Sequence, residues 1–258
     1  MRLIASLKLR NLEGVKKFEK ILEILSNIKF ELDLTKFIVS EDFQKFIPLI
    51  ASEIEDIFRD RISYIKVLKY QSKDVIERLL NLLDYLNVDR VILKVPEDVD
   101  HMVDIVDEAS RYGVKTVWRF SKIESFETLS DIANSIAPYK LRIAIDVAGR
   151  RSVKDFTREL LMSSGYVEVI YLDNKDGSSR GLPIFHTSGK INFVKIFKIL
   201  KCVGYDRDLV LNYRPRYYLD YVRDIELAES VISSVGSSVV DKFTKKLVED
   251  VMREMMNL

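Results

Sequence analysis

The sequence predicts a single α/β domain, a (β/α)8 barrel with an additional C-terminal helix, and three observations lead to this prediction. Short apolar, β-branched runs recur along the 258 residues, and a segment with helical periodicity follows each of them. Strict alternation of this kind is typical of a parallel sheet, and eight units are the number that closes a barrel. No Gly-x-Gly-x-x-Gly follows the first run, which argues against the alternative, an open dinucleotide-binding sheet.

The predicted strands are rich in Val, Ile, Leu and aromatic residues and cover 3–9, 30–34, 64–70, 90–95, 116–120, 142–147, 167–172 and 209–213. The predicted helices cover 12–28, 40–59, 72–86, 96–112, 125–137, 152–163, 192–203, 219–235 and 239–256. In the first helix Leu12, Val15 and Phe18 share one face, which suits packing against a sheet. Ser40, Ser72 and Ser125 offer side-chain oxygens as N-caps. No stretch resembles a linker, so we expect one domain over residues 1–258.

Composition narrows the classes of function. With 31% charged and 47% hydrophobic residues and a net charge of +1, the chain resembles neither a disordered protein nor one drawn to polyanions by its overall charge. Cys202 is the only cysteine, which excludes an internal disulfide and fits a reducing cytoplasm. We expect no signal peptide and no membrane span, and hence a cytoplasmic protein. Many Lys and Glu residues and only two glutamines suggest a thermophilic source.

Charged and amide side chains follow the predicted strands, where barrels of this kind place their active sites. Cations outnumber carboxylates there, and guanidinium groups match carboxylate and phosphate oxygens. The predicted ligand-binding residues are Glu31, Lys94, Arg119, Arg150, Asn212 and Arg214. The candidate acid–base residues are Asp146, Asp173 and His186, the last within the Gly- and Ser-rich connection 174–189, which we expect to be a functional or mobile loop.

Each of these residues also has a plain structural interpretation. Strand-end cations can be solvated rim residues, and Asp146 or Asp173 can cap a loop or pair with an arginine. Four tyrosines follow the last strand near three arginines, a mixture that suits nucleic acid: Tyr213, Tyr217, Tyr218, Tyr221, Arg214, Arg216 and Arg223. No extended basic stripe accompanies them, so we do not expect a nucleic-acid partner.

The last third of the chain carries a resemblance. "IAIDVAGR" (143–150), "IYLDNKDG" (170–177) and the stretch from "LPIFHTSG" to "LVLNY" (182–213) resemble, in order, the closing strands of the xylose isomerase-like barrels, the superfamily of sugar-phosphate isomerases and epimerases and endonuclease IV. "YGVKTVWRF" and "FELDL" extend the resemblance more weakly. It implies a (β/α)8 barrel and a divalent metal held by a glutamate, an aspartate or histidine, a histidine and a final glutamate on strands five to eight.

The sequence departs from that implied metal site. Arg119 and Asn212 stand in the places of the two glutamates, and Gly149 and Tyr171 in the places of the two histidines, whereas Asp146 and Asp173 are retained. An arginine beside a divalent cation is electrostatically unfavourable. The resemblance, read with these departures, therefore implies a degenerate metal site.

We expect the chain to need no cofactor and to bind an anionic small molecule, a sugar phosphate or a carboxylate, at the carboxyl ends of the strands. One alternative is a metal-dependent isomerase or epimerase that holds Mn²⁺, Mg²⁺ or Zn²⁺ through Glu31, Asp146 and Asp173. Another is a non-catalytic scaffold. In that case the helix 239–256, whose stripe contains Val240, Phe243, Leu247, Val251 and Met255, would form a homodimer contact instead of covering its own barrel.

Overall fold

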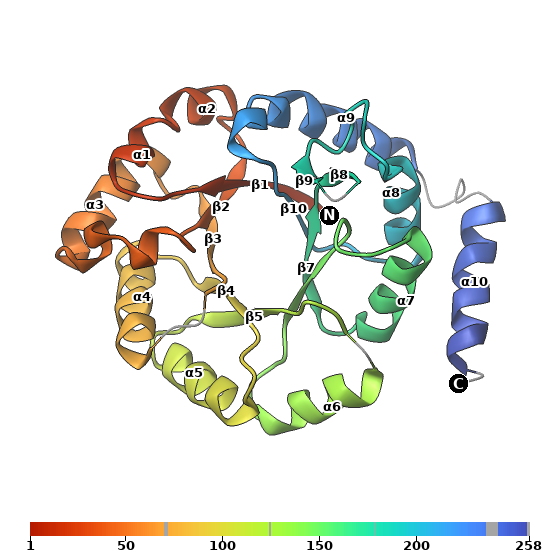
Figure 1. Ribbon diagram of the computed structural model, residues 1–258, viewed down its shortest axis with the longest axis horizontal. Helices are drawn as coiled ribbons and strands as arrows, with labels where there is room; N and C mark the ends of the chain where they lie inside the picture. The colour runs from red at the N-terminus through yellow and green to blue at the C-terminus, as the bar shows by residue number, and fades with distance from the viewer. Residues whose placement is uncertain (70–71, 124, 178, 236–241, 257–258) are drawn as a thin grey trace. The chain divides into compact units, whose positions relative to one another are not determined.

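The computed structural model describes residues 1–69, 72–123, 125–177, 179–235 and 242–256. Eight parallel strands form a closed barrel in the order β1-β10-β7-β6-β5-β4-β3-β2. Helices lie between consecutive strands along the chain (Figure 1). The strands are β1 (Arg2–Lys8), β2 (Lys29–Asp33), β3 (Ile62–Val67), β4 (Arg90–Lys94), β5 (Lys115–Arg119), β6 (Ile143–Asp146), β7 (Val167–Leu172) and β10 (Asp208–Leu211). All eight predicted strands and the predicted fold are confirmed.

The helices follow the predicted order with two differences. They are α1 (Glu13–Lys16), α2 (Glu19–Ile24), α3 (Ile47–Phe58), α4 (Lys73–Tyr85), α5 (Val99–Arg111), α6 (Phe126–Ser135), α7 (Val153–Ser163), α8 (Phe193–Cys202), α9 (Asp220–Ser234) and α10 (Lys242–Met256), with 3₁₀ turns η1 (Phe37–Val39), η2 (Glu41–Gln44) and η3 (Pro215–Tyr217). The single helix predicted over 12–28 is divided into α1 and α2. The helix predicted over 40–59 begins only at Ile47, because Pro48 is tolerated in a first turn and would clash with a carbonyl four residues earlier.

The contacts of the chain divide it into two compact units. One contains residues 4–120 and 127–144, and the other contains residues 1–3, 121–126 and 145–258. In the first unit, Phe30 of β2 packs edge to face against Phe58 of α3, with ring centroids 6.0 Å apart. Side chains alternate along a strand, so Glu31 and Asp33 lie on the opposite face of β2, away from this helix.

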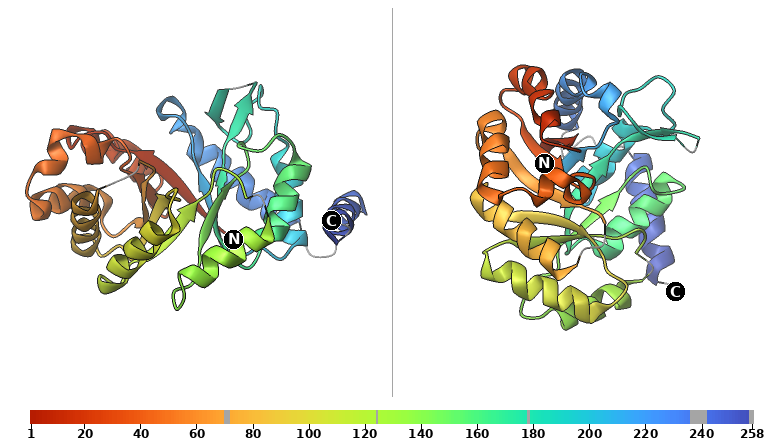
Figure 2. Two further views of the ribbon diagram at one scale, coloured as in Figure 1. Left: turned by 60° about the horizontal axis from the view of Figure 1, so that its bottom comes forward. Right: turned by 60° about the vertical axis from the view of Figure 1, so that its left-hand side comes forward.

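In the second unit, the predicted loop 174–189 contains an antiparallel hairpin of β8 (Asn174–Asp176) and β9 (Ser179–Leu182). Helix α10 packs against α7 and α8 (Figures 1 and 2). Its buried residues are Thr244, Val248 and Val251, while Phe243 is 84% exposed. The predicted stripe was therefore wrong at Phe243, and Val240 lies outside the described residues.

No helix within the described ranges is long and apolar enough to cross a membrane.

Candidate functional site

Two aspartates at the carboxyl ends of β6 and β7 share one arginine from the hairpin. Nη2 of Arg180 lies 2.5 Å from both Oδ1 and Oδ2 of Asp146 and 3.7 Å from Oδ1 of Asp173. The carboxylates are nearly buried, with side chains 6% and 1% exposed, whereas the Arg180 side chain is 41% exposed. We call Asp146, Asp173 and Arg180 the arginine cluster. It holds two negative charges and one positive charge, and its cation is the part that solvent reaches.

The hairpin is fixed beside these aspartates by Gly181. The amide of Gly181 donates to Oδ2 of Asp173 at 2.8 Å, and its carbonyl accepts from the amide of Arg214 at 2.9 Å. Gly181 has φ +81°, and a Cβ there would lie 2.9 Å from Cγ of Arg214, so only glycine suits this position. Arg214 in turn donates from Nη2 to Oγ of Ser179 at 2.8 Å. The guanidinium groups of Arg180 and Arg214 are thus both held at one hairpin.

Asn174 fixes the other end of the loop. Its Nδ2 donates to the carbonyls of Ile184 and Ile191 at 3.0 and 3.2 Å, and its Oδ1 accepts from the amides of Lys175 and Ile191 at 2.9 Å each. Gly189 packs so closely that a Cβ would lie 2.2 Å from Nδ2 of Asn174. The loop 174–191 is therefore tied together by one buried amide.

Asn212 follows β10 beside this group. Its backbone amide donates to the carbonyl of Leu172 on the neighbouring strand β7 at 3.1 Å. Leu172 directly precedes Asp173, so Asn212 lies at the same end of the sheet as Asp173. Its Oδ1 is buried and has no hydrogen-bond partner among the described residues. A buried acceptor without a partner is costly unless something supplies a donor.

Three of the four tyrosines after β10 belong to the core, and Tyr217 is partly exposed. Tyr213, Tyr218 and Tyr221 are buried. The ring of Tyr221 stacks on both of the others, with its centroid 4.6 Å from that of Tyr213 and 5.6 Å from that of Tyr218. Burial, followed by the charge of Asp224, raises the pKa of Tyr213 well above its usual value. Its hydroxyl therefore keeps its proton and donates to Oδ2 of Asp224 at 2.7 Å while accepting from the amide of Ile184 at 3.0 Å.

The first unit contains a second pair of carboxylates bridged by a cation. Nζ of Lys66 lies 2.6 Å from Oε1 of Glu31, 3.1 Å from Oδ2 of Asp33 and 3.4 Å from Oγ of Ser6. Ser6 donates to the same Glu31 oxygen at 2.6 Å. The Lys66 and Glu31 side chains are 1% and 0% exposed. We call Ser6, Glu31, Asp33 and Lys66 the lysine cluster.

Burial raises the pKa of the Asp33 carboxyl, but the Lys66 ammonium and the hydrogen bonds from Thr35 together lower it below its usual value. Asp33 therefore stays ionised beside Lys66, and its Oδ1 accepts from the amide of Thr35 at 3.0 Å. Lys66 was not predicted as a site residue, because it lies within the apolar run 64–70. One signal could have identified Lys66: it is a charged residue in the middle of a predicted strand, and the preceding predicted strand contains Glu31.

The other predicted site residues are distributed over both units. Lys94 and Arg119 are register partners at the ends of β4 and β5 in the first unit. Arg150 is 9% exposed and paired with Glu159 of α7, and it also donates to the carbonyl of Ser121 at 3.0 Å. Nδ1 of His186 accepts from the amide of Ser188 at 3.3 Å and lies 2.9 Å from its hydroxyl, and the ring packs against Tyr217. Within the second unit, Asp146 and Asp173 lie together beside Arg180, which was not among the predicted residues, and Arg214 bonds to Ser179 of the same hairpin.

The residues retained from the implied metal site do not fit a divalent ion as they stand. The two retained carboxylates, Asp146 and Asp173, already have the Arg180 guanidinium beside them, and Glu31, the third ligand of the metal-dependent alternative, has Lys66. Within the described ranges no group of three or more His, Cys, Asp or Glu side chains is arranged to hold a metal ion. A guanidinium group balances the charge of one pair, and an ammonium group balances that of the other.

No model of a protein family matches this sequence, and no curated protein matches it. Solved structures do match. A xylose isomerase domain protein from Planctomyces limnophilus is 13% identical with a TM-score of 0.56, over 91% of this chain and 96% of that one. A xylose isomerase-like TIM barrel protein from Mycobacterium smegmatis, in complex with magnesium, is 11% identical with a TM-score of 0.61, over 91% and 97%.

The 3-hexulose-6-phosphate synthase from Salmonella typhimurium is 12% identical with a TM-score of 0.59, over 92% of this chain and 100% of that one. At these identities the similarity establishes the fold and leaves the activity to the residues of the site. The chain has the fold of the xylose isomerase-like (β/α)8 barrels.

Proposed function

We propose that this chain binds a small polyhydroxylated anion, a sugar phosphate or a sugar carboxylate, at the carboxyl ends of β6, β7 and β10. The observation that carries the proposal is the Arg180 guanidinium, which the hairpin holds beside the oxygens of Asp146 and Asp173, together with a second guanidinium, that of Arg214, bonded to Ser179 of the same hairpin. Their charges balance, with two cations and two carboxylates. A ligand that combines donor hydroxyls with an anionic group matches both halves of this arrangement.

The chemistry of recognition follows from the side chains. Carboxylate oxygens accept hydrogen bonds from sugar hydroxyls, and the partnerless Oδ1 of Asn212 offers a further acceptor. The guanidinium groups take the phosphate or carboxylate in a planar fork. Arg180 must loosen its contact with Asp146 to do so, and its 41% exposure allows this. The lysine cluster cannot do the same, because its cation is 1% exposed.

We propose that this binding requires no divalent metal. A metal between Asp146 and Asp173 would face the Arg180 guanidinium, and two unit charges 4 Å apart already repel by about 4 kcal/mol near a protein surface. A metal-dependent isomerase or epimerase remains the alternative, in which Arg180 turns outward and Mn²⁺, Mg²⁺ or Zn²⁺ takes its place. Elemental analysis of the purified protein after incubation with each metal separates the two, because stoichiometric metal would support the alternative.

Catalysis is a separate matter from binding. Asp146 and Asp173 are the groups that a bound sugar would meet, and they are the candidate acid–base pair of the site. Nδ1 of His186 is engaged by Ser188, and the ring packs on Tyr217, so we assign it no contact with the arginine cluster.

The test is a thermal-shift panel in the presence of EDTA, with ribose 5-phosphate, fructose 6-phosphate, gluconate, inorganic phosphate and glucose. We expect the phosphorylated or carboxylated sugars to raise the melting temperature more than phosphate or glucose alone. Arg214→Met should abolish the shift in melting temperature. The control is Arg111→Met, which changes a side chain of α5 that is 71% exposed and should leave the shift unchanged. A panel without any shift, or equal shifts in both variants, would contradict the proposal.

A further inference from the structure

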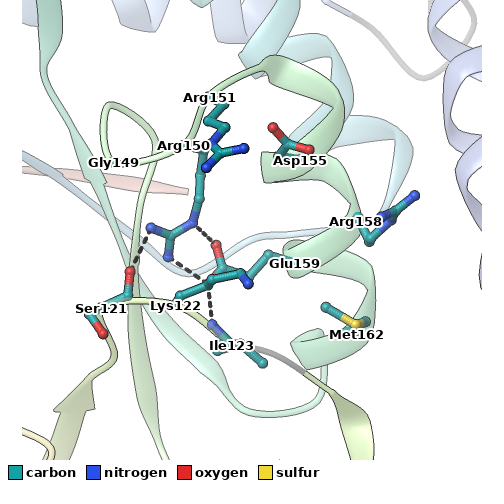
Figure 3. A pocket seen from close by; sticks show the side chains of 10 residues that line it. All are labelled: Ser121, Lys122, Ile123, Gly149, Arg150, Arg151, Asp155, Arg158, Glu159 and Met162. Atoms are coloured by element: carbon teal, nitrogen blue, oxygen red, sulfur yellow. Dashed lines mark hydrogen bonds and ion pairs between the residues drawn. The ribbon is translucent and has the colours of Figure 1, made fainter.

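A pocket of about 470 Å³ lies in the second unit, between the segment after β5 and one face of α7 (Figure 3). Asp155, Arg158, Glu159 and Met162 line it from α7 at helical spacing. Ser121, Lys122 and Ile123 line the opposite wall, and the loop before α7 contributes Gly149, Arg150 and Arg151. A volume of this size is within the range of small-molecule sites.

The floor of the pocket is a buried ion pair. The side chains of Arg150 and Glu159 are 9% and 4% exposed, and Arg150 contacts both carboxylate oxygens. Oε1 of Glu159 also accepts from the amide of Ile123 at 3.1 Å. A guanidinium has five N–H donors, and the described contacts of Arg150 use one each from Nε, Nη1 and Nη2. The second hydrogens of Nη1 and Nη2 remain in a nearly buried cation that lines the pocket.

The rim carries an excess of positive charge. Four cations and two carboxylates line the pocket, which leaves a net charge of +2. Arg151 has no hydrogen-bond or ion-pair partner among the described residues and is exposed at the pocket edge. Arg158 pairs with Glu254 of α10 at 2.8 Å, but its Nε is buried and has no partner within the described part of the chain. Asp155 opposes this charge at the rim and accepts from the Ser152 hydroxyl at 2.9 Å.

Apolar groups complete the lining. Met162 lies one turn beyond Glu159 on the same face of α7, and Ile123 lies opposite (Figure 3). We propose that this pocket is a second ligand site, for a small molecule that joins a phosphate or carboxylate group to an apolar body. The anionic group would bind Arg151 and the remaining N–H groups of Arg150, and the apolar body would contact Met162 and Ile123.

This site is distinct from the arginine cluster, although the two adjoin at Gly149. The amide of Gly149 donates to Oδ1 of Asp146 at 3.3 Å, and the same residue lines the pocket. The two proposed ligands differ in the part that carries no charge. The ligand of the arginine cluster has hydroxyl groups that bind its carboxylates, and the ligand of the pocket has an apolar body that contacts Met162. The inference therefore stands or fails separately from the proposed function.

The test is isothermal titration of the full chain with phenyl phosphate, inorganic phosphate and benzyl alcohol. We expect phenyl phosphate to bind most tightly, since it alone supplies both groups. Arg151→Met should weaken it about tenfold, the effect of losing one charged hydrogen bond. Lys20→Met, the same charge change at an exposed site on α2, should leave the affinity unchanged, as should Arg214→Met.

A second variant, Met162→Glu, places a carboxylate at the end of the pocket and should also weaken phenyl phosphate while leaving the response to sugar phosphates intact. No binding of phenyl phosphate at millimolar concentration would overturn the inference. So would an affinity equal to that of inorganic phosphate, or equal losses in Arg151→Met and Lys20→Met.

Discussion

The lysine cluster and the arginine cluster both balance the charge of two carboxylates with one cation, but the two cations differ in their exposure to solvent. Each has a pair of carboxylates with one cation beside them. Glu31 and Asp33 both lie on β2, whereas Asp146 ends β6 and Asp173 follows β7. In the lysine cluster the cation comes from β3 itself and is 1% exposed. In the arginine cluster the cation comes from the hairpin β8–β9 and is 41% exposed.

This difference separates a structural role from the binding role that we propose. A buried charge must keep its partner, because an unpaired ion in a protein interior costs several kcal/mol. Lys66 is therefore committed to Glu31 and Asp33. Arg180 can exchange Asp146 for another anion, since water reaches its guanidinium and the hairpin stays anchored through Gly181. Three predictions test this contrast, from the largest expected effect to the smallest.

Lys66→Met should lower the free energy of unfolding by about 3–5 kcal/mol, because it leaves Glu31 and Asp33 as two buried carboxylates without their cation. Urea unfolding at neutral pH measures the effect. Adding Glu31→Gln and Asp33→Asn to the variant removes the uncompensated charges and should restore most of the loss. A loss below about 1 kcal/mol in the single variant would contradict the structural role.

Arg180→Met should cost less, about 1–2 kcal/mol. Asp173 keeps the amide of Gly181, Asp146 keeps the amide of Gly149, and water can replace the exposed guanidinium. The same urea titration applies, with Arg111→Met as the matched control that should stay near wild type. A loss as large as that of Lys66→Met would mean that the two clusters do not differ as we describe.

Acid should weaken the fold through Asp33, and this effect is the smallest of the three. Its pKa is lowered in the folded protein from the usual 3.8, so it contributes stability that is present above pH 3.8 and is lost as the pH falls through the folded pKa. Unfolding free energies from pH 6 to pH 2.5 should decrease less steeply below pH 4 in Asp33→Asn than in the wild type. Identical slopes would show that Lys66 does not hold this carboxyl.

The strands and most helices could be predicted because their signals are local. Each strand is a short apolar run, and each helix repeats apolar residues over several turns. The clusters depend on pairings that the sequence does not reveal. Arg180 reaches Asp146 from 34 positions away through a hairpin hidden in a predicted loop. Arg150 was predicted to bind a ligand, but its ion pair with Glu159, nine positions later on α7, was not predicted. That pairing requires the turn between β6 and α7 to be known.

The most direct test of the contrast is a pair of crystal structures in the presence of EDTA, one without added ligand and one with ribose 5-phosphate. We predict that Nζ of Lys66 remains at hydrogen-bond distance from Glu31 in both. We predict that the phosphate contacts Arg180 and Arg214 and that Arg180 has released Asp146. A phosphate bound elsewhere, or an unchanged contact between Arg180 and Asp146 beside a bound sugar, would contradict the account.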